Sequence, residues 1–285
     1  MSLSESYSSS AVQHKAVIVA QITDSHLFSS PDGLHHGKNV LDNLKKVLFN
    51  ICQNPHIKHI IFTGDLTQDH TEQSYQNFVH CVHECRVTVP VYYVAGNHDD
   101  PELLTKYFSE PPFLSDKTIT FPNWQIQLID SKSETPAGYV SEHALAKLST
   151  SIDKDKSQLL MMHHHPTDVG YFIDKHGLQN KMDFWQAMNS YNNIEGIACG
   201  HVHGAIELTS PLSRPLTKTF NESLNKPRNE QPKKAKESVT VYTCPATSIQ
   251  FDPSADGAGA LDLGPGYRIF YLYPDSQLLS DVVML

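Results

Sequence analysis

The sequence lacks a long apolar segment at its start. Residues 1–14 are rich in serine and contain no run that could serve as a signal peptide or a membrane span. No exposed amphipathic insert suited to a membrane surface follows them. We therefore expect a disordered N-terminal tail over 1–14 on a cytoplasmic protein that has no membrane partner.

Cysteine is scarce and does not come in pairs. The chain has 5 cysteines, and only Cys81 and Cys85 are close in sequence. Their spacing makes them neighbours on a helical face. The pattern excludes a disulfide framework and a zinc cluster held by thiolates, and it fits a reducing compartment.

The sequence also lacks an excess of positive charge. It has 22 lysines and arginines against 31 acidic residues, which gives a net charge of -9. This balance argues against binding to a nucleic acid polymer, although a metal site can still accept a small anion. The length of 285 residues and the 39% hydrophobic content suffice for one large α/β domain or two small ones.

Histidine is abundant, with 17 copies, and several copies follow apolar segments. The segment Ala16–Ile22 reads as a strand buried on both faces, and Asp24 and His26 come directly after it. Side chains two residues apart on an extended backbone point the same way, so these two form half of a metal site. The alternative is an Asp that caps a helix beside an isolated His.

A strand–helix–strand pattern brings a second carboxylate to the same place. Asn39 can cap an amphipathic helix, and the strand Ile57–Thr63 then leads into Gly64-Asp65. A right-handed parallel crossover puts Asp24 and Asp65 at one edge of the sheet.

A third strand, Val89–Val94, leads into Gly96-Asn97-His98-Asp99. Alone this stretch is also ordinary turn and helix-start chemistry. Gly96 lets the backbone bend close to a metal. We expect Asp99 to cap the helix near 101–108 and to lie outside the site.

Two later strands add imidazoles. Gln158–Met162 ends in His163-His164-His165, of which we expect one metal ligand, His163 or His164, and two supporting residues. Ile194–Cys199 leads to His201 and His203, which share one face.

Further strands are expected at 117–121, 124–129, 239–243, 268–272 and 278–284, with helices after Ser141 and around Phe184. Residues 210–237 contain four prolines, seven basic residues and three acidic ones. This composition predicts a flexible basic insert between two strands of a hairpin, with a docking segment as the alternative.

The strand-end residues together form a mixed oxygen and nitrogen ligand set: Asp24, His26, Asp65, Asn97, His163, His201 and His203. Such a set suits iron, manganese, zinc or nickel rather than calcium or magnesium alone. Seven ligands exceed the need of one ion. Two ions about 3.5–4 Å apart, bridged by Asp65, could hold a hydroxide and clamp a phosphoryl group.

The ordered motifs Asp-x-His, Gly-Asp, Gly-Asn-His-Asp, strand-end His and Gly-His-x-His resemble those of the calcineurin-like metallophosphoesterases. The segments 21–28, 163–166, 244–251 and 264–268 resemble the bacterial class III 3',5'-cyclic AMP phosphodiesterases, the CpdA group. The resemblance implies an α/β fold, a four-layer αββα sandwich of two mixed β-sheets flanked by helices. It also implies a single domain over 15–285.

The resemblance also implies residue roles. Asp24, His26, Asp65 and His203 would hold one metal, and Asp65, Asn97, His163 and His201 the other, as iron or manganese in divalent or mixed-valence form. His98 would be the catalytic residue, which stabilises charge or protonates the leaving oxygen. Asp69 is the candidate acid that orients His98. The expected substrate contacts are His26, Asp65, Asn97, His98 and His203.

The leading hypothesis is hydrolysis of 3',5'-cyclic AMP to 5'-AMP by attack of a metal-bridging hydroxide, with a small cyclic nucleotide as the partner. A second hypothesis keeps the chemistry but changes the substrate to a 2',3'-cyclic nucleotide, a nucleotide-linked lipid precursor or a phosphomonoester. A third is a non-catalytic metal-binding scaffold. The sequence leaves a homodimer open.

Overall fold

The computed structural model describes residues 16–211 and 238–285, which form two six-stranded sheets and a short hairpin. The expected tail over 1–14 and residues 212–237 of the expected insert lie outside this part of the chain. The first sheet has the order β14 (Leu278–Met284), β13 (Gly266–Leu272), β1 (Val17–Ile22), β4 (Ile57–Phe62), β5 (Val91–Tyr93) and β6 (Phe113–Leu114). The second has the order β11 (Glu207–Pro211), β12 (Ser238–Thr243), β10 (Ile194–Cys199), β9 (Ser157–Met162), β8 (Trp124–Leu128) and β7 (Thr118–Thr120).

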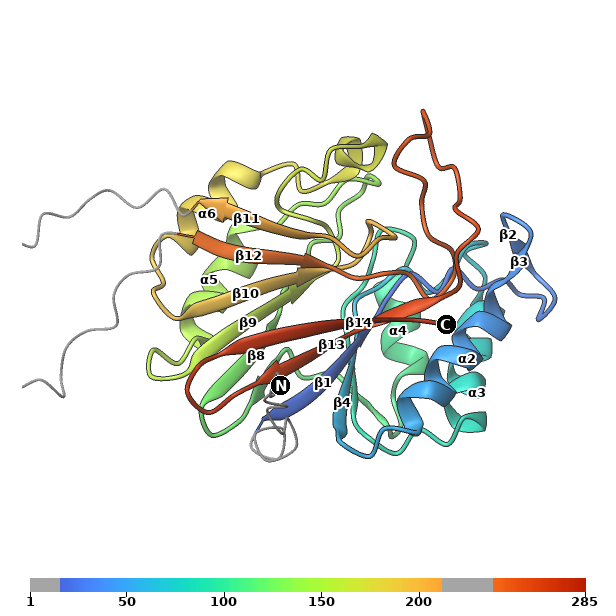
Figure 1. The fold of residues 1–285 in the computed structure, drawn as a ribbon, viewed down its shortest axis with the longest axis horizontal. Coiled ribbons are helices and arrows are strands. Elements are labelled where there is room, and N and C mark those ends of the chain that lie inside the picture. The colour runs from blue at the N-terminus through green and yellow to red at the C-terminus, as the bar shows by residue number, and fades with distance from the viewer. Residues whose placement is uncertain (1–15, 212–237) are drawn as a thin grey trace, which may run out of the picture.

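The two sheets pack face to face, and helices cover their outer faces (Figure 1). Strand β1 shows how the sequence produces these layers. Ile18 and Ile22 lie in the core on the helix side, whereas Val19 lies in the core between the sheets. Because strand side chains alternate, a continuous apolar strand buries both of its faces.

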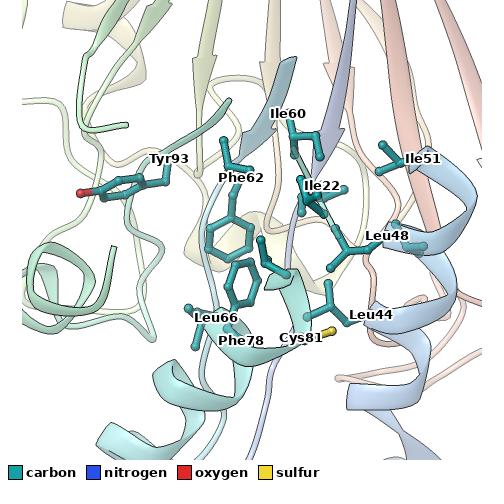
Figure 2. Packing of buried hydrophobic residues seen from close by; sticks show 14 of the residues in the cluster. Ile22, Leu44, Leu48, Ile51, Ile60, Phe62, Leu66, Phe78, Cys81 and Tyr93 are labelled. Carbon is teal, nitrogen blue, oxygen red and sulfur yellow. The ribbon is translucent and has the colours of Figure 1, made fainter. Parts of the chain in front are cut away.

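The outer face of the first sheet is covered by α2 (Val40–Cys52), α3 (Glu72–Glu84) and α4 (Pro101–Tyr107). Figure 2 shows Leu48 of α2 and Phe78 of α3 in the same apolar cluster as Ile22 and Phe62 of the strands. The Asn39 side chain accepts a hydrogen bond from the backbone of α2, so the predicted cap is confirmed.

The outer face of the second sheet packs against α5 (Glu142–Ser151) and α6 (Lys181–Met188), and a 3₁₀ helix, η1 (Phe172–His176), precedes α6. Ser141 caps α5 through its side chain, as predicted. Parallel pairs in both sheets are flanked by antiparallel ones. The predicted four-layer αββα arrangement of mixed sheets is therefore confirmed.

Some element boundaries differ from prediction. Strand β5 spans only Val91–Tyr93, and the hairpin of β2 (Leu34–His35) and β3 (Lys38–Asn39) was not predicted. Short two-residue strands carry too little periodicity to be recognised. The predicted hairpin around the insert is confirmed, since β11 and β12 pair antiparallel. Within the described ranges, no helix has the length and apolar character needed to cross a bilayer.

Candidate metal centre

The loops after β1, β4 and β10 meet at one edge of the two sheets and hold the backbone in an uncommon conformation. Five of the predicted ligands have positive φ angles between 46° and 66°: Asp24, His26, Asp65, His201 and His203. For residues other than glycine this region costs about 1–3 kcal/mol each. Such strain is typical of functional sites, where the surrounding structure holds side chains in fixed positions.

One group of side chains gathers around Asp24. His26 Nε2 lies 3.1 Å from His203 Nε2, and His203 Nε2 lies 3.3 Å from Asp24 Oδ1. His203 donates its Nδ1–H to the carbonyl of Ile249 at 2.8 Å, so Nε2 presents its lone pair to the group.

A second group gathers around His163. Its Nδ1–H donates to the carbonyl of Thr63 at 2.7 Å, which fixes the ring with Nε2 on the side of the second group. This Nε2 lies 3.1 Å from Asn97 Oδ1, 3.1 Å from His201 Nδ1 and 3.4 Å from Asp65 Oδ2. The same carboxylate oxygen lies 3.7 Å from His26 Nε2 of the first group. Asp65 therefore stands between the two groups.

These contacts crowd imidazole nitrogens and oxygen atoms within hydrogen-bond distance of one another. In the described part of the chain, Asp24 Oδ1 and His201 Nε2 are buried without a hydrogen-bond partner. Buried polar atoms without a partner are costly, and a cation held between such ligand atoms would satisfy them. The absence of thiolates and the imidazole–carboxylate mixture match transition metals. The seven predicted residues thus come together and fit a pair of metal ions.

Neighbouring histidines lower the pKa values of the two buried carboxyl groups, Asp24 and Asp65. Burial alone would raise the pKa of Asp24, but His203, aided by His26, holds the pKa of this carboxyl well below its usual range. Burial likewise opposes ionisation of Asp65, and His163 chiefly holds its pKa well below the usual range. Both carboxylates are therefore anionic near neutral pH, as metal ligands must be.

The structure distinguishes His163 from His164. His164 Nδ1 accepts from the Ser131 hydroxyl at 2.9 Å, and its Nε2 contacts the carbonyl of Pro136 at 3.2 Å. Both ring nitrogens of His164 are thus engaged away from Asp65, although an atom of this ring lies near His163 and His201. The third histidine, His165, pairs with Asp174 at 3.1 Å. His163 is the one whose Nε2 faces Asp65 and the centre.

His98 lies at the edge of the centre. Its backbone N–H donates to Asp65 Oδ1 at 2.9 Å, and its ring lies edge-on to His26 and stacks on His70. Burial lowers the pKa of His98 to about 4, with Asp65 opposing this shift and His26 adding to it. His98 and Lys132 line a cleft of about 330 Å³.

Asp69 does not orient His98, contrary to the expectation from the resemblance. Its carboxylate accepts hydrogen bonds from the backbone N–H of Ser29 at 2.7 Å and from the Thr71 hydroxyl at 2.7 Å. The Nδ1 atom of His98 is buried and has no hydrogen-bond partner among the described residues. Asp69 therefore links the loop at Ser29 to its own loop, and the His70 ring stacks on His98.

The prediction for Asp99 was wrong, because Asp100 caps α4. Asp99 instead accepts hydrogen bonds from the backbone N–H groups of Asp65 at 2.8 Å, Leu66 at 2.7 Å and Gly96 at 2.8 Å. Its side chain is buried, and burial raises its pKa to about 6, with Asp65 adding to the shift. Asp99 therefore fixes the backbone that carries the ligand between the two groups. Asp99 and Asp100 are adjacent and precede Pro101, so the sequence pattern alone could not show which of them caps α4.

Gly96 is required by close approach. A Cβ atom at this position would lie 2.1 Å from Asp65 Oδ1 and 2.4 Å from the Asp65 backbone nitrogen. The predicted role of Gly96 is thus given a physical basis, because any side chain would displace the carboxylate.

The segment 244–251, which carries part of the resemblance, contacts two of the predicted ligand residues, Asp24 and His203. The Ser248 hydroxyl donates to the carbonyl of Asp24 at 2.6 Å, and the Phe251 ring stacks on His203 with centroids 4.0 Å apart. With the carbonyl of Ile249 on His203, three contacts from one segment fix two ligand residues.

Comparisons with known proteins agree with this geometry. A family model described as calcineurin-like phosphoesterase matches residues 18–205. The chain therefore belongs to the calcineurin-like phosphoesterase family, which implies a dinuclear site for divalent metals.

Particular relatives are similar over nearly the whole chain. A probable cyclic nucleotide phosphodiesterase of Colwellia psychrerythraea is 63% identical over 285 residues and is covered completely, as is this chain. The 3',5'-cyclic adenosine monophosphate phosphodiesterase CpdA of Haemophilus influenzae is 29% identical over 269 residues, with coverage of 92% of this chain and 88% of that protein. A dimetal phosphatase from Danio rerio shares the fold with a TM-score of 0.63 at 14% identity, covering 94% of this chain and 96% of that one.

Replacing Asp99 tests its role in holding the centre. In Asp99→Asn an amide group faces backbone N–H donors, so we expect metal affinity to fall by about 10–100-fold. Metal titration of the stripped protein measures the change. Asp100→Asn is the matched control, because Asn also caps a helix. Equal metal affinity in the two variants would show that Asp99 has no such role.

The choice between His163 and His164 is tested in the same assay. Because outer-shell changes alone cost 10–100-fold, we expect His163→Ala to lower metal affinity by more than about 100-fold. His164→Ala should retain metal, since its nitrogens are bonded elsewhere. Circular dichroism checks that both variants are folded. Loss of metal from His164→Ala alone would reverse the assignment.

Proposed function

We propose that this protein is a metal-dependent phosphodiesterase that hydrolyses 3',5'-cyclic AMP to 5'-AMP. The observation that carries the proposal is the pair of ligand groups that share Asp65, with His98 beside them at a cleft. The names of the relatives from Colwellia psychrerythraea and Haemophilus influenzae support the choice of a cyclic nucleotide.

The proposed metal ligands are those that the two groups present. Asp24, His26 and His203 would hold one ion, and Asn97, His163 and His201 the other, with Asp65 shared. Iron or manganese, divalent or mixed-valence, suits this donor set. When bound, such ions supply Lewis acidity and lower the pKa of water.

The side chains at the cleft would position the substrate. In the reaction the oxygen of water bonds to phosphorus, the bond from phosphorus to the 3' oxygen breaks, and the leaving oxygen takes up a proton. His98 lines the cleft, and we assign to its ring the donation of a proton to that leaving oxygen. The backbone bond from His98 to Asp65 ties its position to the metal ligands. His26, Asp65, Asn97 and His203 complete the proposed substrate contacts.

A local positive charge would attract the anionic substrate to an otherwise acidic protein. The Lys132 ammonium donates to the carbonyl of Asn97 at 3.1 Å and lines the cleft. A cation in a concave site raises the local concentration of anions.

The five cysteines are free thiols, which suits a reducing cytoplasm, where we place the reaction.

A substrate panel tests the proposal. Protein reconstituted with manganese or iron should hydrolyse 3',5'-cyclic AMP with a kcat/KM at least about tenfold above those for 2',3'-cyclic AMP and p-nitrophenyl phosphate. Chelated protein serves as the blank. A fully metal-loaded protein that turned over the monoester but not the cyclic nucleotide would support the phosphoesterase class and remove the proposed substrate.

The role of His98 is tested by His98→Ala. Loss of a group that donates to the leaving oxygen should lower kcat by about 10²–10⁴-fold, whereas metal content should stay unchanged. His80→Ala is the matched control, because His80 lies exposed on α3. A wild-type kcat in the metal-loaded His98→Ala protein would exclude this role.

A further inference from the structure

The hairpin of β2 and β3 brings another histidine to the metal centre. His36 and Gly37 form its turn with φ angles of 47° and 77°, the conformation that joins tightly paired strands. His35 pairs with Lys38 across the hairpin. Because strand side chains alternate, Leu34 points outward, where it is 58% exposed, and His35 points inward.

The His35 ring lies against a predicted metal ligand. Its centroid is 5.3 Å from that of His26, whose ring also lies 4.9 Å from His98 and 4.9 Å from His203. His26 is thus flanked by His35 as well as by the residue proposed to act on the leaving group. The Nδ1 atom of His35 is buried and has no hydrogen-bond partner in residues 16–211 and 238–285.

The hairpin is held in place on both sides. The Lys38 ammonium pairs with Asp262 at 2.6 Å, and the Asn39 amide donates to the carbonyl of Pro31 at 3.0 Å. Asn39 also caps α2, so the hairpin continues directly into a packed helix. These contacts present His35 at a defined position beside the centre.

His35 is not placed as a metal ligand. The sets of ligand atoms close enough to share an ion consist of Asp24, His26, Asp65, His98, His163, His164, His201 and His203 in various combinations. His35 belongs to none of them. An imidazole offers one donor and one acceptor, and a buried ring nitrogen normally finds a partner. The Nδ1 atom of His35 thus has hydrogen-bonding capacity that no described residue uses.

We propose that His35 is a substrate-binding residue that forms a hydrogen bond with an oxygen of the phosphate group held at the metal centre. The inference rests on the proposed function for its substrate class. His35 lies outside the motif segments that carry the family resemblance, so it would tune how this chain holds its substrate. The competing explanation is that His35 only fills space beside His26. In that case a leucine of similar volume would serve equally well.

The test uses inorganic phosphate as the probe and the full-length protein loaded with manganese. His35→Leu keeps the packing but removes the hydrogen bond. Its neighbour provides the matched control, His36→Leu, because His36 is exposed. His35→Asn restores a short polar group. Metal content is measured for each variant, phosphate binding by calorimetry, and kcat and KM with the preferred phosphodiester.

We expect full metal content in all variants. Phosphate Kd and substrate KM should rise about three- to tenfold in His35→Leu, the value of one hydrogen bond, and should recover in part in His35→Asn. His36→Leu should match the wild type. Unchanged phosphate binding in His35→Leu, or loss of metal from it, would overturn the inference.

The outcomes also separate this inference from the proposed function. Phosphate binding does not depend on which ester is hydrolysed. A wild-type protein that binds phosphate but does not turn over 3',5'-cyclic AMP would defeat the proposed substrate, while the comparison between His35→Leu and His36→Leu would still decide the role of His35.

Discussion

Crowding of buried ligand atoms is the constraint on which this structure depends. His26 Nε2 faces His203 Nε2, and His163 Nε2 faces Asn97 Oδ1, each across 3.1 Å. Backbone carbonyls hold the far nitrogens of His163 and His203 and so fix the orientation of both rings. The cost of this arrangement is recovered when cations enter, so affinity for metal is built up during folding.

Hydrogen bonds to backbone groups hold the loops that carry the metal ligands. Three N–H groups converge on Asp99, and the hydroxyl of Ser248 binds the carbonyl of Asp24. Each contact ties one strand-end loop to another segment. Strained loops persist only when the surrounding structure determines them this fully. The site is therefore as much a property of the loop network as of the ligands.

The sequence predicted the parallel strand–helix–strand unit, the strand-end ligands and the helix caps Asn39 and Ser141, because each depends on short-range periodicity and on the rule that parallel strands end at one edge. It did not reveal the partner of Asp99, since Asp99 and Asp100 both fit a helix cap and only tertiary contacts separate them. The role expected for Asp69 came from the resemblance and was wrong, because Asp69 accepts hydrogen bonds from Ser29 and Thr71. The hairpin that carries His35 was missed because its strands have two residues each.

The contact between Ile249 and His203 has a consequence for how the protein matures. Asp24 emerges early in synthesis, but the carbonyl that orients His203 lies far along the chain, after β12. Contacts between such distant segments form late. A partly synthesised chain thus has several ligands but no assembled centre. The complete ligand set therefore depends on the packing of the segment that follows β12.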